Sequence, residues 1–87
     1  MSYINVFFIT EDRKIFIQAK YTMTFGELVF KYLEKRCISD KVPLQYLFNN
    51  DSIEPNSIKT LSELKIIDGS TIDVVELNKL KGALFLK

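Results

Sequence analysis

Residues 60–77 have the sequence TLSELKIIDGSTIDVVEL, which is the most informative segment of the chain about its fold. Its first part predicts one tight turn of helix that directs Leu61, Leu64 and Ile66 inward. The acidic residue and glycine at positions 68–69 then predict a chain reversal.

Beyond that reversal the residues alternate in character, which indicates a strand. Ile72 and Val74 share one side of it, and Asp73 and Val75 share the other. A strand with one apolar side so late in a small domain is typical of an insertion into the middle of a sheet. We therefore expect the other strands of that sheet earlier in the chain.

Two such strands are predicted at residues 4–10 and 14–20, where apolar residues again alternate. The polar link between them is so short that the two strands should form an antiparallel hairpin. The inward side chains would be Ile4, Val6, Phe8, Ile15, Ile17 and Ala19, and the outward ones include Phe7, Ile9 and Phe16.

A helix is predicted directly after this hairpin. Thr24 and Glu27 have the spacing of a capping box, in which each side chain accepts a hydrogen bond from the backbone of the other. The apolar stripe that follows should cover the hairpin, and it consists of Phe25, Leu28, Val29, Tyr32 and Leu33.

A third strand is predicted at residues 44–49, with Tyr46 and Phe48 inward and Leu47 outward. The polar cluster at residues 49–52 predicts a turn. We expect Ile53 to begin a brief edge strand, which ends before Pro55 because proline cannot donate a ladder hydrogen bond.

This order of elements resembles the ubiquitin-like β-grasp family over nearly the whole chain. The segments that carry the resemblance are TFGELVFKYLEK, LQYLFNNDSI and TLSELKIIDGSTIDVV. The resemblance implies an α+β fold in ββαββ order, with one main helix packed on one face of a mixed four- to five-stranded sheet. It also implies that the last strand is central and parallel to the first. We expect a ubiquitin-like domain at residues 1–77 and a C-terminal extension at residues 78–87.

Composition excludes several classes of partner. The 87 residues carry 12 basic and 11 acidic side chains, for a net charge of +1, and the basic residues are scattered. This balance gives no reason to expect nucleic acid as a partner. No apolar run reaches the roughly 18 residues of a membrane span, so we expect no membrane insertion.

The single cysteine cannot form an internal disulfide, which favours an intracellular and by default cytoplasmic protein.

Catalytic chemistry has few candidate residues. The chain has no histidine, which removes Cys–His and Ser–His pairs and histidine metal sites. Cys37 follows the helix C-terminus, where the dipole does not stabilise a thiolate, and we expect it to be a partly buried structural residue. We therefore predict neither an enzyme nor a cofactor or metal site.

The outward side of the predicted sheet is the candidate functional surface. Phe7, Ile9, Phe16, Leu47 and Val75 would all lie there, and a large exposed apolar patch is typical of an interface. Single exposed apolar residues are common, so an incidental origin is the alternative.

The resemblance adds a detail to this surface. Leu47 and Val75 match positions of ubiquitin's hydrophobic recognition patch, and Asp73 stands where ubiquitin has a histidine. This implies a protein-binding surface that is altered in detail.

The extension at residues 78–87 separates the possible functions. A conjugated modifier needs a terminal Gly-Gly, whereas this chain has a single Gly82 followed by Ala83. Leu84 and Phe85 suit a segment that docks on the domain's own edge or on a partner. We therefore predict a non-catalytic protein-protein interaction domain, an adaptor or accessory subunit of a larger assembly. The alternatives are a modifier processed after Gly82, a purely structural subunit, and a ubiquitin-like domain of a longer protein.

Overall fold

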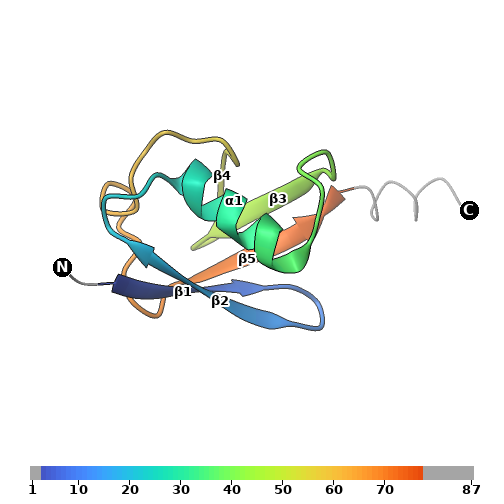
Figure 1. Ribbon diagram of the computed structural model, residues 1–87, viewed down its shortest axis with the longest axis horizontal. Helices are drawn as coiled ribbons and strands as arrows, with labels where there is room; N and C mark the ends of the chain where they lie inside the picture. Colours follow the sequence, from blue (N-terminus) through green and yellow to red (C-terminus); the bar gives the residue numbers. More distant parts are fainter. Residues whose placement is uncertain (1–2, 78–87) are drawn as a thin grey trace, which may run out of the picture.

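The computed structural model describes residues 3–77, which form one helix and five strands (Figure 1). In chain order these are β1 (Tyr3–Ile9), β2 (Lys14–Lys20), α1 (Phe25–Arg36), β3 (Leu44–Phe48), β4 (Asp51–Ile53) and β5 (Thr71–Glu76). The described part of the chain contains no helix long and apolar enough to cross a membrane.

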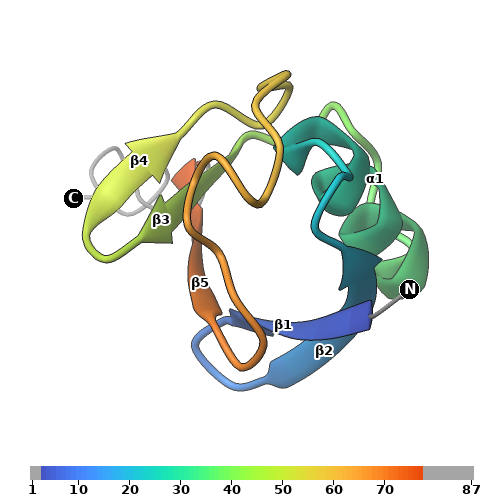
Figure 2. The ribbon, with the colours of Figure 1, turned by 90° about the vertical axis from the view of Figure 1, so that its left-hand side faces the viewer.

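The five strands form a single mixed sheet in the order β2-β1-β5-β3-β4. β5 is central and runs parallel to β1, while the other neighbouring pairs are antiparallel. The sheet curves around α1, which packs on one of its faces (Figure 2). The predicted α+β fold is therefore confirmed, and the short β4 is the fifth strand.

The core lies between α1 and the sheet, and aromatic rings fill its centre. Tyr32 of α1 stacks on Phe8 of β1, with ring centroids 4.3 Å apart. Tyr46 of β3 meets both rings edge-on, at 6.2 Å from Phe8 and 6.4 Å from Tyr32. The buried apolar residues include every inward position predicted for β1 and the helical residues Phe25, Leu28, Val29 and Tyr32. Alternation in the strands and helical spacing thus produce one continuous core.

The start of α1 forms the predicted capping box. The Glu27 amide donates to Thr24 Oγ1 at 3.1 Å, and the Thr24 amide donates to Glu27 Oε1 at 2.9 Å. At the other end, Cys37 adopts a left-handed conformation with φ 55°, and its amide donates to the Glu34 carbonyl. The cysteine is exposed, so the expectation of a partly buried residue was wrong. As the C-cap, Cys37 leaves the helical path and no longer belongs to the stripe that faces the sheet.

Residues 60–66 form a capped turn where one turn of helix was predicted. A second capping box starts it, because the Glu63 amide donates to Thr60 Oγ1 at 3.1 Å and the Thr60 amide donates to Glu63 Oε1 at 2.8 Å. Lys65 then takes a left-handed conformation with φ 62°, which prevents helical continuation. The inward positions are nevertheless as predicted: Leu61 and Ile66 are buried, and Leu64 packs against the core.

The reversal before β5 is tied to the start of β1. Gly69 has φ +90°, a conformation that favours glycine, and its amide donates to the Asn5 carbonyl at 2.8 Å. In return, the Asn5 amide donates to Asp68 Oδ1 at 2.7 Å. These two hydrogen bonds set β5 beside β1 and so determine which side chains become neighbours on the sheet.

The turn between β3 and β4 consists of two asparagines. Asn49 and Asn50 both have positive φ, 52° and 69°, which is typical of a tight two-residue hairpin turn. Because this turn is so short, pairing begins at Asp51, opposite Phe48. The edge strand β4 thus begins at Asp51 and ends at Ile53. The prediction that it begins at Ile53 was wrong.

Candidate interaction surface

Strand pairing places the candidate residues on the sheet face opposite α1. Phe7 of β1 lies opposite Phe16 of β2 on one side and opposite Thr71 of β5 on the other. Residues directly opposite each other project from the same face of a sheet. Since the adjacent Phe8 is buried under the helix, Phe7 and its neighbours face away from the core.

The next row of this face crosses three strands. Ile9 of β1 lies opposite Asp73 of β5, and Asp73 lies opposite Leu47 of β3. Val75 follows on the same side of β5 and lies opposite Gln45. We call the set that shares this side the outward face: Phe7, Ile9, Phe16, Leu47, Asp73 and Val75.

The outward face is partly open to solvent. Phe16 is 50% exposed, and Phe7, Ile9 and Leu47 are half-buried by their neighbours. Asp73 is exposed and stands between Ile9 and Leu47. The surface therefore combines apolar side chains with one carboxylate near its middle.

Lysine side chains cover the aromatic half of the outward face. The Lys14 ammonium lies 4.8 Å from the centroid of the Phe7 ring, and the Lys35 ammonium lies 4.6 Å from that of Phe16. Lys35 comes from the last turn of α1 and also donates to the Phe16 carbonyl at 2.9 Å. Ammonium groups over ring faces are attracted by the ring quadrupole. This half of the face is therefore both aromatic and basic, and Asp73 places a single acidic group next to it, between Ile9 and Leu47.

Tyr3 extends the aromatic half of the outward face, although it was not predicted as a candidate site residue. It is 54% exposed, and the Lys20 ammonium lies 5.5 Å from its ring centroid. Tyr3 belongs to the same alternation as Phe7 and Ile9, so that pattern was the signal that could have identified it.

Two predicted site residues are not placed by this geometry. Leu84 and Phe85 lie outside residues 3–77, which are the residues that the structure describes. Their role in binding stays a prediction from the sequence.

A single helix packed on a mixed sheet, with a central last strand parallel to the first, defines the ubiquitin-like β-grasp class of proteins. The model of one family in this class, Rad60-SLD, described as "Ubiquitin-2 like Rad60 SUMO-like", matches residues 4–75. The chain therefore belongs to this family, as a divergent ubiquitin-like member.

Solved structures support the fold across distant sequences. A ubiquitin-like domain of an Arabidopsis thaliana protein superposes with a TM-score of 0.75 at 17% identity, covering 87% of this chain and 79% of that one. Caldiarchaeum subterraneum ubiquitin superposes with a TM-score of 0.74 at 10% identity, covering 86% and 94%. ATBAG1, solved in complex with HSP70, has a TM-score of 0.72 at 18% identity, covering 95% of this chain and 46% of that one. A comparison with curated proteins gave no match.

Proposed function

We propose that this protein is a non-catalytic ubiquitin-like interaction domain, acting as a small adaptor or accessory subunit of a larger protein assembly. It binds other proteins through the outward face, and Leu84 and Phe85 of the C-terminal extension add a second apolar contact. We assign it to the interior of the cell, because its single cysteine is suited to a reducing compartment.

The observation that carries this proposal is that residues from four different strands lie together on the outward face. Its residues come from β1, β2, β3 and β5, which are far apart in the sequence, yet strand register places them side by side. A half-exposed aromatic pair beside branched apolar side chains is the kind of anchor that dominates protein interfaces. Asp73 and the lysines over the rings supply charges of opposite sign, which orient a partner more than they add affinity.

A structural neighbour supports the class of partner. ATBAG1, which shares this fold over 46% of its own chain, was solved in complex with another protein, HSP70. The shared fold supports a protein as the class of partner.

The proposal is tested by purifying the tagged full-length protein under native conditions and identifying what co-purifies. The double variant Phe7→Asp and Leu47→Asp should lose the specific partner, because both substitutions place a charge at an apolar anchor. Phe30→Asp is the matched control, since Phe30 is 61% exposed but belongs to α1 rather than to the outward face. Retention of the partner by the double variant would contradict the proposal.

A conjugated modifier is the competing hypothesis, and it has a separate test. Processing after Gly82 would remove residues 83–87 and lower the intact mass accordingly. We expect the native protein to keep these residues and to form no thioester with an activating enzyme.

A further inference from the structure

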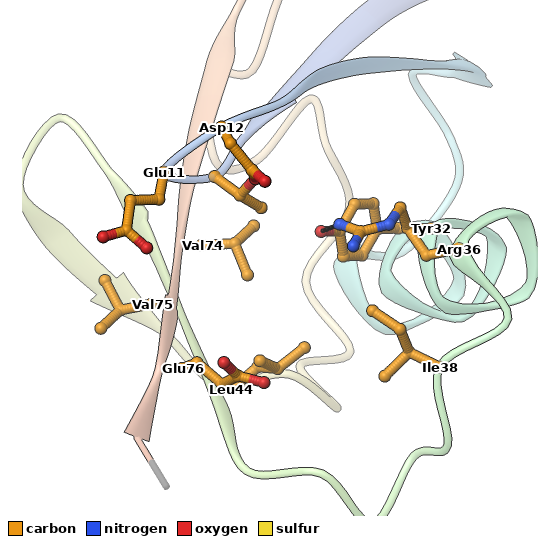
Figure 3. A pocket seen from close by; sticks show the side chains of 10 residues that line it. Glu11, Asp12, Tyr32, Arg36, Ile38, Leu44, Val74, Val75 and Glu76 are labelled. Carbon is orange, nitrogen blue, oxygen red and sulfur yellow. Dashed lines mark hydrogen bonds between the residues drawn. The ribbon is translucent and has the colours of Figure 1, made fainter. Parts of the chain in front are cut away.

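A cavity of about 350 Å³ opens at the end of the domain where β5 finishes. Figure 3 shows that Val74 points into it from β5, toward Tyr32 of α1, while Val75 points to the other side of the strand. Ile38 and Leu44 complete its apolar wall, and both are only half-buried. The hydrophobic core is thus left open at this end, and an apolar side chain placed there would be removed from water.

Carboxylates stand around the mouth of this cavity. Asp12 lines it from the link between β1 and β2, and Glu76 lines it from the end of β5. Both are exposed. The lining also contains Arg36, but its Nη1 donates to the Tyr32 hydroxyl at 3.0 Å, and its guanidinium carbon lies 5.9 Å from that ring's centroid. The arginine is therefore held against the cavity wall, and the mouth favours a basic occupant.

The chain itself leaves the described structure at this mouth. Glu76 is the last residue of β5, and the next amide, that of Leu77, donates to the Pro43 carbonyl at 3.0 Å. The residues that follow, NKLKGALFLK at positions 78–87, contain three lysines and no acidic side chain. They also contain four large apolar residues, Leu80, Leu84, Phe85 and Leu86. Ten residues extend up to about 33 Å, which is ample to turn back into the cavity.

We infer that, in the free protein, residues 78–87 fold back and occupy this cavity. Their apolar side chains contact the wall formed by Ile38, Leu44 and Val74, and their lysines pair with the carboxylates at the mouth. Because the segment is covalently attached beside its site, weak contacts suffice for occupancy, since a short tether gives a local concentration of about a millimolar or more.

This inference goes beyond the proposed function, because it concerns the domain before it meets a partner. A partner that uses Leu84 and Phe85 would have to draw them out of the cavity. Val75 belongs to both sites, because it lies on the outward face and also lines the cavity, but Phe7, Phe16 and Leu47 do not line it. Those three anchors would remain available whether or not the cavity is occupied, so the two proposals can fail separately.

The test compares backbone amide chemical shifts of the full-length protein with those of the variant Leu84→Asp, Phe85→Asp. Neither substitution falls within residues 3–77, which contain the helix and all five strands, so the fold should be unaffected. We expect the shift changes to concentrate at the cavity, around residues 10–12, 36–38 and 74–76, and to be small around Phe7 and Phe16. Adding a synthetic peptide of residues 78–87 to the variant should restore the original shifts at roughly millimolar peptide.

Charge reversal tests the mouth of the cavity. Asp12→Lys with Glu76→Lys, introduced into the Leu84→Asp, Phe85→Asp variant, should weaken binding of the added peptide severalfold. Asp51→Lys in the same background should not, because Asp51 pairs with Phe48 at the opposite end of β3. Raising the salt concentration should weaken peptide binding in the parent variant more than in the charge-reversed one.

Two results would overturn the inference. One is that the Leu84→Asp, Phe85→Asp variant leaves the shifts at the cavity unchanged or moves those of another surface instead. The other is that the cavity shifts of the full-length protein change with protein concentration, because the occupant would then be the segment of a second copy.

Discussion

The rings of Phe7 and Phe16 face each other across the β1–β2 hairpin, with centroids 6.2 Å apart and planes inclined at 49°. Tilted ring pairs at this separation attract each other beyond the area that they bury. The pair sits on the sheet face that α1 leaves uncovered, and lysine ammonium groups lie over both rings. A prepacked aromatic pair loses little side-chain freedom on binding, which is the property expected of an interface anchor.

Loss of the Asp68 carboxylate should destabilise the fold. Asp68→Ala removes the acceptor of the Asn5 amide, which joins the reversal before β5 to the start of β1. We expect the free energy of unfolding to fall by about 1 kcal/mol in urea titrations. Asp51→Ala is the control, because Asp51 is also exposed but belongs to the edge strand. An equal fall in the free energy of unfolding in the two variants would show that the hydrogen bond to Asn5 does not stabilise the fold.

Gly26→Ala should also destabilise the protein, although alanine is the better helix former. A Cβ atom at this position would lie 3.2 Å from the Ser57 carbonyl oxygen, which already accepts the Gly26 amide at 3.0 Å. The loop that contains Ser57 would have to move away from the start of α1, and such overpacking typically costs about 1–3 kcal/mol. A rise in melting temperature on this substitution would contradict the prediction. It would mean that the loop moves at little cost and that the higher helix propensity of alanine outweighs this cost.

Stability should fall steeply at alkaline pH because of Tyr46. Burial, with a smaller effect from the neighbouring Tyr32, raises the pKa of Tyr46 from 10.0 to about 12. The unfolded chain therefore releases this proton at lower pH than the folded protein does. The stabilisation is complete below pH 10.0 and is lost as the pH rises toward about 12.

The measurement is chemical unfolding of the wild type and of Tyr46→Phe at several pH values between 9 and 11.5. Wild-type stability should fall by up to about 1.4 kcal/mol per pH unit above the ordinary tyrosine pKa, in addition to changes that both proteins share. Tyr46→Phe should lack this additional slope. Parallel curves for the two proteins would contradict the assignment to Tyr46.

The periodicity of the sequence predicted the fold because local and tertiary preferences agree in most elements. Ile4, Val6 and Phe8 alternate with outward residues, and all three are buried. Thr24 and Glu27 have capping-box spacing, and both of their hydrogen bonds form. The late position of β5 in the chain already suggested a strand in the middle of the sheet. That β5 is parallel to β1 came instead from the resemblance to the ubiquitin-like family, since alternation alone does not determine strand direction.

The errors arose where backbone conformation departs from what the side chains suggest. The left-handed conformation of Lys65 ends the predicted helix at residues 60–66, which becomes a capped turn. Lysine has no preference for the left-handed region, so its presence at position 65 could not predict this conformation. Likewise, Lys35 covers Phe16 only because α1 ends beside β2. That contact depends on the tertiary arrangement, so sequence patterns could not reveal it. Whether the outward face binds a protein stays a prediction.

The most direct test of that prediction is titration calorimetry with the protein that co-purifies with the wild type. Wild type, Phe7→Asp, Leu47→Asp and Phe30→Asp should each be titrated after their folding has been checked by circular dichroism. We expect either outward-face substitution to raise Kd by about tenfold or more, a loss of roughly 1.4 kcal/mol, and Phe30→Asp to leave Kd nearly unchanged. Unchanged affinity for both outward-face variants, with weakened binding by Phe30→Asp, would contradict binding through the outward face. It would indicate that the partner binds α1 instead.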